Sequence, residues 1–325
     1  MRLFVCVILS TFFLATAFSA FAYDTLFVQD IDDKAQTLAH YTMGLIYDWN
    51  GSLDKAVESL EKATQIESDN YSVALRLGAS YGRLGDFEKA VVQLKKAATL
   101  RPKDVQAHYL LAIIYSSQSK EEEATDEYEL ILQKVIEKDP DSSEGYAYLG
   151  QLYYSQGRIT PAIEQFEKVL TLNSNDAEIL SILGSLFLEV PNRKKAIEFF
   201  KRSIKNNPKH DGSLNSLGYM YAEDGINLGE ARELVKRSLE VDPENGAYLD
   251  SMGWVYYKQG DYEKAVLFLE RAIKFIEDPI VYDHLGDAYL GLKKPQKALE
   301  NWEKSLEMLP DQENVLKKIQ ENQTP

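Results

Sequence analysis

Cysteine is almost absent from this sequence, with Cys6 the single one among 325 residues. Because Cys6 lies in an apolar N-terminal run, the rest of the chain can form neither a disulfide bond nor a thiolate metal site. Histidine is scarce as well: His40, His108, His210 and His284 lie far apart and lack the spacing of paired metal ligands. The sequence therefore predicts no bound metal and no cofactor.

Motifs for catalysis are also lacking. The sequence has no G-x-S-x-G nucleophile elbow, no phosphate-binding glycine loop and no dinucleotide fingerprint. Carboxylates are abundant, but among 51 acidic residues their closeness in the sequence carries no information. We expect no catalytic residues and interpret the chain as a non-enzyme.

Positive charge is in deficit. Lysine and arginine total 36 against 51 acidic residues, which leaves a formal net charge of −15. Such a chain repels nucleic-acid phosphates and anionic lipid headgroups, so we expect neither nucleic acid nor an anionic membrane surface as a direct partner.

Small residues recur with a steady period along most of the chain. Successive steps of 34, 34, 38, 34, 34, 35 and 33 residues separate Gly44, Gly78, Ala112, Gly150, Gly184, Gly218, Gly253 and Gly286. A period of this length indicates a solenoid of stacked units, whose product is an extended surface. We therefore expect a binding protein.

The residues around each small residue predict two short helices. After Gly78 come Tyr81, the turn glycine Gly85, Ala90 and Leu94, and Pro102 ends the second segment. Apolar residues recur at spacings of three and four in each half, as amphipathic helices require. Proline lacks a backbone donor and disfavours helical geometry in the residue before it, so it terminates the second helix.

The same frame repeats eight times. Its second small position is Ala56, Ala90, Ala124, Ala162, Ala196, Ala231, Ala265 and Ala298, and its aromatic position is Tyr47, Tyr81, Tyr115, Tyr153, Phe187, Tyr221, Tyr256 and Tyr289. This pattern resembles the tetratricopeptide repeat (TPR). The resemblance implies an all-α, right-handed α-α superhelix, a TPR solenoid of about eight helix-turn-helix repeats with a C-terminal capping helix.

We expect four segments along the chain. Residues 1–22 are a signal peptide, 23–36 an acidic and loosely ordered lead, and 311–325 a capping helix and tail, with an apolar stripe of Val315, Leu316 and Ile319. Residues 37–310 hold the eight units, which start near residues 37, 71, 105, 143, 177, 211, 246 and 279. The third unit carries four extra residues, which predict a second helix about one turn longer than the others, with its apolar face kept in phase.

The N-terminal run predicts export. Arg2 precedes an uncharged apolar stretch that ends in Ala20-Phe21-Ala22, the small-x-small pattern of a signal-peptidase site, so Tyr23 is the expected first mature residue. The alternative is a retained N-terminal membrane anchor, because about 20 apolar residues are just long enough to span a bilayer. A chain that is cysteine-free after cleavage fits a periplasmic or secreted protein, and no cysteine at the cleavage point could carry a lipid.

In tetratricopeptide arrays the first helix of each unit lines a concave groove, so the resemblance implies that partner proteins or peptides bind there. Aromatic and polar residues concentrate at the groove positions of the later units, and we expect the partner-binding groove to consist of Asn215, Tyr219, Asp250, Trp254, Tyr257, Asp283 and Asp287. The alternative is ordinary groove lining. The lysine and asparagine pattern of the family's carboxylate-clamp units is absent from these positions, which argues against a cytosolic co-chaperone.

The C-terminal units resemble the last repeats of bacterial cell-envelope TPR adaptor proteins, through the D-S-M-G-W and H-L-G-D segments. Some of those adaptors serve envelope proteases, so the resemblance implies an envelope protease or biogenesis complex as a partner. We predict a non-catalytic interaction scaffold or adaptor of the bacterial cell envelope. The alternative is a periplasmic protein that binds glycan or peptidoglycan fragments through Trp254 and the tyrosines.

Overall fold

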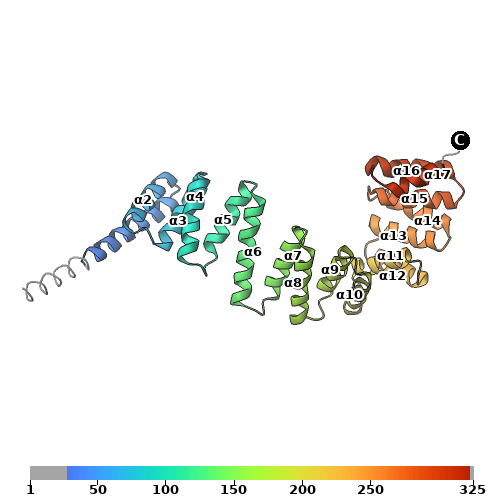
Figure 1. Ribbon diagram of the computed structural model, residues 1–325, viewed down its shortest axis with the longest axis horizontal. Coiled ribbons are helices and arrows are strands. Elements are labelled where there is room, and N and C mark those ends of the chain that lie inside the picture. Colours follow the sequence, from blue (N-terminus) through green and yellow to red (C-terminus); the bar gives the residue numbers. More distant parts are fainter. Residues whose placement is uncertain (1–27, 323–325) are drawn as a thin grey trace, which may run out of the picture. The chain divides into compact units, whose positions relative to one another are not determined.

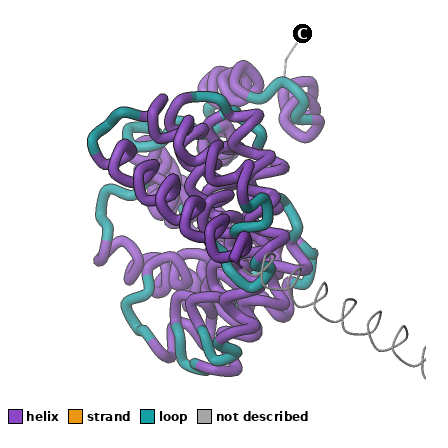
Figure 2. The backbone as a smooth tube through the Cα atoms, turned by 90° about the vertical axis from the view of Figure 1, so that its left-hand side faces the viewer, coloured by secondary structure: helices purple, strands orange, loops and turns teal. Residues whose placement is uncertain are grey.

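The computed structural model describes residues 28–322, which form an all-α array of helices joined by short loops, without a strand in that range (Figures 1 and 2). The proposed signal peptide, residues 1–22, lies outside the described residues. The first described helix covers residues 28–49. It is followed by α2 (Leu53–Ile66), α3 (Tyr71–Leu84), α4 (Phe87–Leu100), α5 (Gln106–Ser117), α6 (Glu121–Lys138), α7 (Ser143–Ser155), α8 (Ile159–Leu172), α9 (Ala177–Glu189), α10 (Arg193–Asn206), α11 (Asp211–Glu223), α12 (Leu228–Val241), α13 (Gly246–Lys258), α14 (Tyr262–Ala272), α15 (Pro279–Gly291), α16 (Pro295–Met308) and α17 (Glu313–Asn322).

The chain divides into two compact units. Unit 1 ends at Gly145 and unit 2 begins at Tyr146. In unit 1, α3 packs on α4 and α5 on α6; in unit 2, α9 packs on α10, α11 on α12, α13 on α14 and α15 on α16. Successive first helices of unit 2 also contact each other, α11 with α13 and α13 with α15. Residues at equal positions of neighbouring repeats are thereby placed side by side.

The periodic small residues are the points of closest approach between the two helices of a pair. A Cβ built on Gly78 lies 2.7 Å from Leu94, and one built on Gly286 lies 2.4 Å from the Trp302 ring. The partner follows sixteen residues later in most pairs, and it is itself fully buried in cases such as Leu94 and Trp302. In these pairs a large side chain on the second helix fills the space that the small residue on the first helix leaves open.

Local signals set the ends of individual helices. The Asn70 side chain accepts hydrogen bonds from the amides of Ser72 and Val73 and so caps the start of α3. Gly85 ends the same helix at φ +83°, a left-handed conformation that glycine adopts without the steric cost of a Cβ. Pro279 begins α15 at a position where its missing amide donor is not needed.

Helix α6 confirms the longer second helix of the third repeat, with 18 residues against 14 in α4 and α8. Its apolar face, however, packs less completely than expected. Ala124 is its only fully buried residue, and the aliphatic residues from Leu130 to Leu132 are only partly buried. The boundary between the two units, after Gly145, falls in the first turn of the next helix, α7.

The prediction of a loosely ordered lead up to residue 36 was wrong for its described part, because residues 28–36 are helical. Two contacts across one helical turn stabilise this start: Lys34 Nζ donates to Asp30 at 2.8 Å, and the Gln36 amide donates to Asp32 at 2.9 Å. Two of the acidic residues that indicated a flexible segment thus take part in contacts along the helix.

The chain of described helices ends in the expected capping helix. In α17, Val315 and Ile319 are buried against the core that includes Trp302, while Leu316, which we had placed on the same stripe, is 42% exposed. Helix α17 packs on α16 and turns its other side to solvent. Within residues 28–322, no helix combines the length and apolar character needed to cross a membrane.

Candidate functional site

The predicted groove residues all lie on three consecutive first helices of unit 2. Asn215 and Tyr219 belong to α11, Asp250, Trp254 and Tyr257 to α13, and Asp283 and Asp287 to α15. The structure brings part of this set together around one pocket of about 460 Å³. The pocket is lined by Tyr219, Glu223, Trp254, Asp283, His284, Asp287, Asn314, Lys317, Lys318 and Glu321.

Trp254 lies inside an aromatic stack. Its ring lies parallel to those of Tyr257 and His284, with centroid distances of 4.7 and 3.9 Å, and its indole N–H donates to Glu223. The side chain is only 7% exposed, so Trp254 forms a wall of the pocket and does not project into the groove as an open anchor. Lys258, one turn further on, places its ammonium 4.8 Å from the ring centroid.

Asp250 and His284 form a buried pair between α13 and α15. His284 Nδ1 lies 2.9 Å from Asp250 Oδ1, and both residues are less than a tenth exposed. Burial alone would lower the pKa of His284, but the carboxylate of Asp250, helped by those of Asp283 and Asp287, raises this pKa above its usual 6.5. Asp250 is therefore bound to His284 and lies behind the residues that line the pocket.

Asp283 and Asp287 receive a lysine from the capping helix. Lys318 Nζ lies 2.6 Å from Asp283 Oδ1 and 2.8 Å from Asp287 Oδ2, and the Trp302 indole N–H donates to Asp287 at 3.1 Å. Burial raises the pKa of Asp287, and the Lys318 ammonium counteracts this rise. The bridge fixes α17 to the groove side of α15.

The two residues predicted on α11 occupy different environments. Tyr219 lines the pocket, with its ring 6.4 Å from that of His284. Burial and the nearby carboxylates of Glu223 and Asp250 raise the pKa of Tyr219, so its hydroxyl stays protonated at neutral pH. Asn215 does not line the pocket, and its Oδ1 is buried without a hydrogen-bond partner among the described residues.

Sequence reasoning missed the contribution of α17. Asn314, Lys317, Lys318 and Glu321 line the pocket, so the groove does contain lysine and asparagine, supplied by a helix that we had interpreted only as a cap. A signal was available: Lys318 follows His284 by 34 residues, one repeat length. Helix α17 thus occupies the place of a further first helix, and Lys318 pairs with Asp283 as His284 pairs with Asp250.

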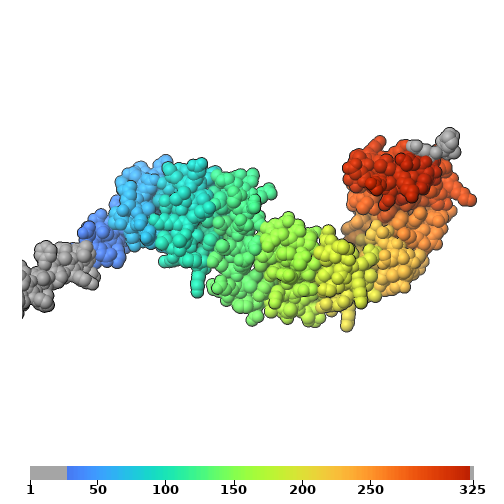
Figure 3. Space-filling view, viewed as in Figure 1, coloured from blue at the N-terminus to red at the C-terminus, as the bar shows by residue number. Residues whose placement is uncertain are grey.

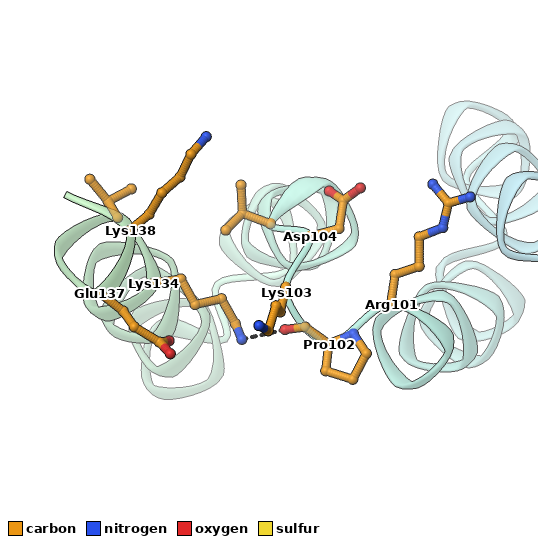
Figure 4. Close-up of a pocket in the computed structure, with 9 residues that line it drawn as sticks. Arg101, Pro102, Lys103, Asp104, Lys134, Glu137 and Lys138 are labelled. Atoms are coloured by element: carbon orange, nitrogen blue, oxygen red, sulfur yellow. Dashed lines mark hydrogen bonds between the residues drawn. The ribbon is translucent and has the colours of Figure 1, made fainter.

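A second pocket, of about 800 Å³, lies in unit 1 beside the loop after α4 and the last turns of α6 (Figure 4). Its lining includes Arg101, Lys103, Lys134 and Lys138, a local excess of positive charge. Two of these cations already have partners: Lys134 donates to the carbonyl of Pro102, and Arg101 stacks 4.2 Å from the Tyr71 ring centroid. None of the predicted site residues lies in this pocket.

The deepest ionisable groups of the unit 2 pocket are already paired within the chain. The described residues contain no group of histidines, cysteines and carboxylates arranged to hold a metal ion. The ionisable groups that line the pocket most deeply, His284, Asp283 and Asp287, are each bound to an opposite charge of the chain itself. The lining residues that remain exposed are Glu223, Asn314, Lys317 and Glu321.

Comparisons with known proteins identify the class. A family model described as TPR repeat matches residues 78–119 and 150–190, and models described as tetratricopeptide repeat match residues 38–70 and 246–278. These matches fall on the helix pairs described above. The chain belongs to the tetratricopeptide repeat family.

Individual relatives match only in part. Tetratricopeptide repeat protein 13 of Homo sapiens is 28% identical over 200 residues, which are 60% of this chain and 22% of that protein. The type IV pilus assembly protein PilF of Pseudomonas aeruginosa is 26% identical over 152 residues, 46% of this chain and 59% of the relative. The chain thus spans less than two thirds of either relative.

Among solved structures, the APC/C hetero-tetramer Cut9-Hcn1 is similar with a TM-score of 0.56 and 18% identity, over 84% of this chain and 53% of that one. At this identity the similarity concerns the fold. Tetratricopeptide repeat proteins are generally protein-interaction scaffolds, and the fold of this chain agrees with that class.

Proposed function

We propose that this protein is a non-catalytic interaction scaffold or adaptor of the bacterial cell envelope, which binds a protein or peptide partner at the unit 2 pocket. The observation that carries this proposal is the pocket itself. Three successive first helices and α17 converge on it and line it with tyrosine, tryptophan, carboxylates and lysines. Aromatic residues beside a few charges are typical of the centres of protein interfaces.

The charges of the pocket favour a basic group on the partner. Four carboxylate residues line it against two lysines, and Lys318 is already bound by Asp283 and Asp287. Glu223 and Glu321 are exposed at the rim, where they are able to meet a lysine or arginine side chain. A partner segment that carries a lysine or arginine would match the exposed carboxylates of the rim.

The glycan alternative has less support from the geometry. Binding of a sugar ring against Trp254 would need an open aromatic face, whereas this indole already stacks on the rings of Tyr257 and His284. With 7% of the residue exposed, little of the ring is left for a ligand. We therefore place the protein partner first.

The envelope setting is supported by the N-terminal sequence and by one relative. Residues 1–22 have the charge and apolar pattern of an export signal, and the partial relative PilF is a type IV pilus assembly protein. An envelope protease or biogenesis complex is the kind of partner that this setting offers. N-terminal sequencing of the protein purified from the envelope is expected to begin at Tyr23, and a start at Met1 would replace cleavage by a retained anchor.

Charge reversal at the rim tests the partner proposal. Glu321→Lys is expected to lower the amount of co-purified partner about fivefold, because an unfavourable contact of roughly 1 kcal/mol replaces a favourable one. Quantitative mass spectrometry of proteins captured from native envelope measures the change. Glu303→Lys on α16, an exposed residue outside the pocket, is the matched control. Equal loss in both variants, or in neither, contradicts binding at this pocket.

A further inference from the structure

The first helix, residues 28–49, carries an apolar stripe along its outer face. Val28, Ile31, Leu38, Ile46 and Trp49 are 65, 52, 63, 43 and 89% exposed. Their spacing of three, seven, eight and three residues, with Ala35, Ala39 and Thr42 between them, keeps the set on one side of the helix over its whole length. The stripe is about 30 Å long at the helical rise per residue.

This stripe is not the face by which the helix joins its own unit. The opposite face packs into unit 1: Thr37 is buried, and a Cβ on Gly44 would lie 2.7 Å from Leu60 of α2. Among the described residues the helix is the first element of unit 1, and it extends beyond α2 (Figure 1; Figure 3 shows the same view in space-filling form). Among the described residues the stripe therefore stays open to solvent, which is unusual for a continuous apolar surface of this length.

The order of side chains along the stripe is close to symmetric when it is read backwards. Large residues stand at both ends, Val28 and Ile31 at one and Ile46 and Trp49 at the other, while the small Ala35, Ala39 and Thr42 flank Leu38 in the middle. In an antiparallel pair of such helices, Val28 and Ile31 of one helix would lie against Ile46 and Trp49 of the other. Each Leu38 would lie over the small residues of the other helix. A self-complementary surface of this kind fits a two-fold interface.

Charge favours the same orientation. Three of the four acidic residues of the helix, Asp30, Asp32 and Asp33, lie at its start, and the fourth, Asp48, is paired with Arg83 of α3. In an antiparallel pair the two Asp32 residues would lie about 20 Å apart, beyond a Debye length of about 8 Å at physiological salt. In a parallel pair the two acidic clusters would face each other.

We propose that the stripe of helix 28–49 binds a second copy of this chain, with the two helices antiparallel. The pair would bury on the order of 1,000 Å² in total, near the lower limit for specific interfaces, so the dimer is expected to be weak, with a Kd of ~1–100 µM. Dimerisation would present two unit 2 pockets on one assembly, and the gain in avidity would strengthen binding to multivalent partners.

Sedimentation velocity of the purified chain tests the interface. The wild-type protein is expected to shift from monomer to dimer between about 1 and 100 µM, and Leu38→Glu is expected to remain monomeric at least tenfold higher in concentration than the wild-type midpoint. Gln29→Glu adds the same charge to the same helix away from the stripe and should leave the dimer intact. A wild-type monomer throughout, or a dimer unaffected by Leu38→Glu, overturns the proposal.

Cysteine cross-linking tests the orientation, because Cys6→Ser leaves the chain free of thiols. Mixing an Ile31→Cys chain with an Ile46→Cys chain is expected to give a disulfide-linked dimer under mild oxidation, while either chain alone gives little. Asp30→Cys, on the other side of the helix, is the control and should not cross-link. Cross-linking of Ile31→Cys to itself would show a parallel pair. If the introduced cysteines were protected from maleimide in a monomeric chain, the stripe would be covered by the chain's own N-terminal residues. Either result rejects the proposal.

Discussion

At the scale of single residues, the pocket rests on charges that the chain neutralises itself. His284 is buried against Asp250 and stacks on Trp254, so one side chain joins α13 to α15 and also fixes the aromatic wall. Lys318 joins α17 to α15 through its ion pairs with Asp283 and Asp287. Because each of these buried charges has a partner, the cost of its burial is partly offset.

The His284 pair predicts a pH-dependent stability. The pKa of His284 in the folded chain is raised above its usual 6.5, so the native state binds the proton more tightly than the unfolded state does. The stabilisation is complete below pH 6.5 and is lost as the pH rises through the native pKa. Asp287, whose pKa is also raised by burial, contributes in the same direction but at more acidic pH.

Urea unfolding at a series of pH values, followed by circular dichroism, measures this effect. The midpoint is expected to fall as the pH rises above 6.5 in the wild type, and His284→Gln should lack that component. The variant is expected to be the less stable protein at acidic pH, with the difference narrowing at alkaline pH. The same slope in both proteins would show that His284 is not protonated in the native state.

At the scale of secondary-structure elements, α17 has two roles. It covers the last apolar face with Val315 and Ile319, and it supplies Lys318 to the groove side of α15. The two contacts lie on neighbouring faces of a helix of ten residues, which is too short to be stable alone in water. Docking on α16 and the Lys318 bridge therefore determine whether α17 is formed.

Removal of the Lys318 charge should loosen α17. Lys318→Met keeps the length of the side chain but leaves Asp283 and Asp287 facing each other without a cation, and we expect a loss of about 1–3 kcal/mol in the local opening free energy of α17. Hydrogen exchange of the α17 amides measures it. The matched control is Lys317→Met, because Lys317 is exposed and makes only a long contact of 3.8 Å to Glu321. Equal protection in both variants would mean that apolar packing alone holds the helix.

At the scale of the whole molecule, the repeat period could be predicted because it is imposed by geometry. Gly286 must be small since Trp302 packs on it, and the same exclusion recurs in pair after pair, so the sequence displays it directly. The positions of the first helices, which carry the predicted groove residues, followed from that repeat period. The extended start of the first helix was missed because its acidic residues were interpreted as a flexible lead.

The detail of the site was less accessible from the sequence. Spacing placed Trp254 and Asp250 on the groove side, but it could not show that His284 of the next repeat would cover the indole and bind the carboxylate. The role of Lys318 was hidden because α17 lacks the marker residues of a complete repeat, although it keeps the spacing from His284. These contacts depend on rotamers at the junction of three helices.

Site-specific photo-cross-linking in cells tests the central claim, that unit 2 binds a protein partner at this pocket. A photoreactive amino acid is placed at Asn314 or Lys317, both exposed at the pocket rim, and at Glu303 on α16 as the control. Both rim positions are expected to capture the same envelope protein, identified by mass spectrometry, and the Glu303 position is expected not to capture it. Equal capture from all three positions, or no protein captured while peptidoglycan fragments bind saturably to the purified chain, would contradict the central claim.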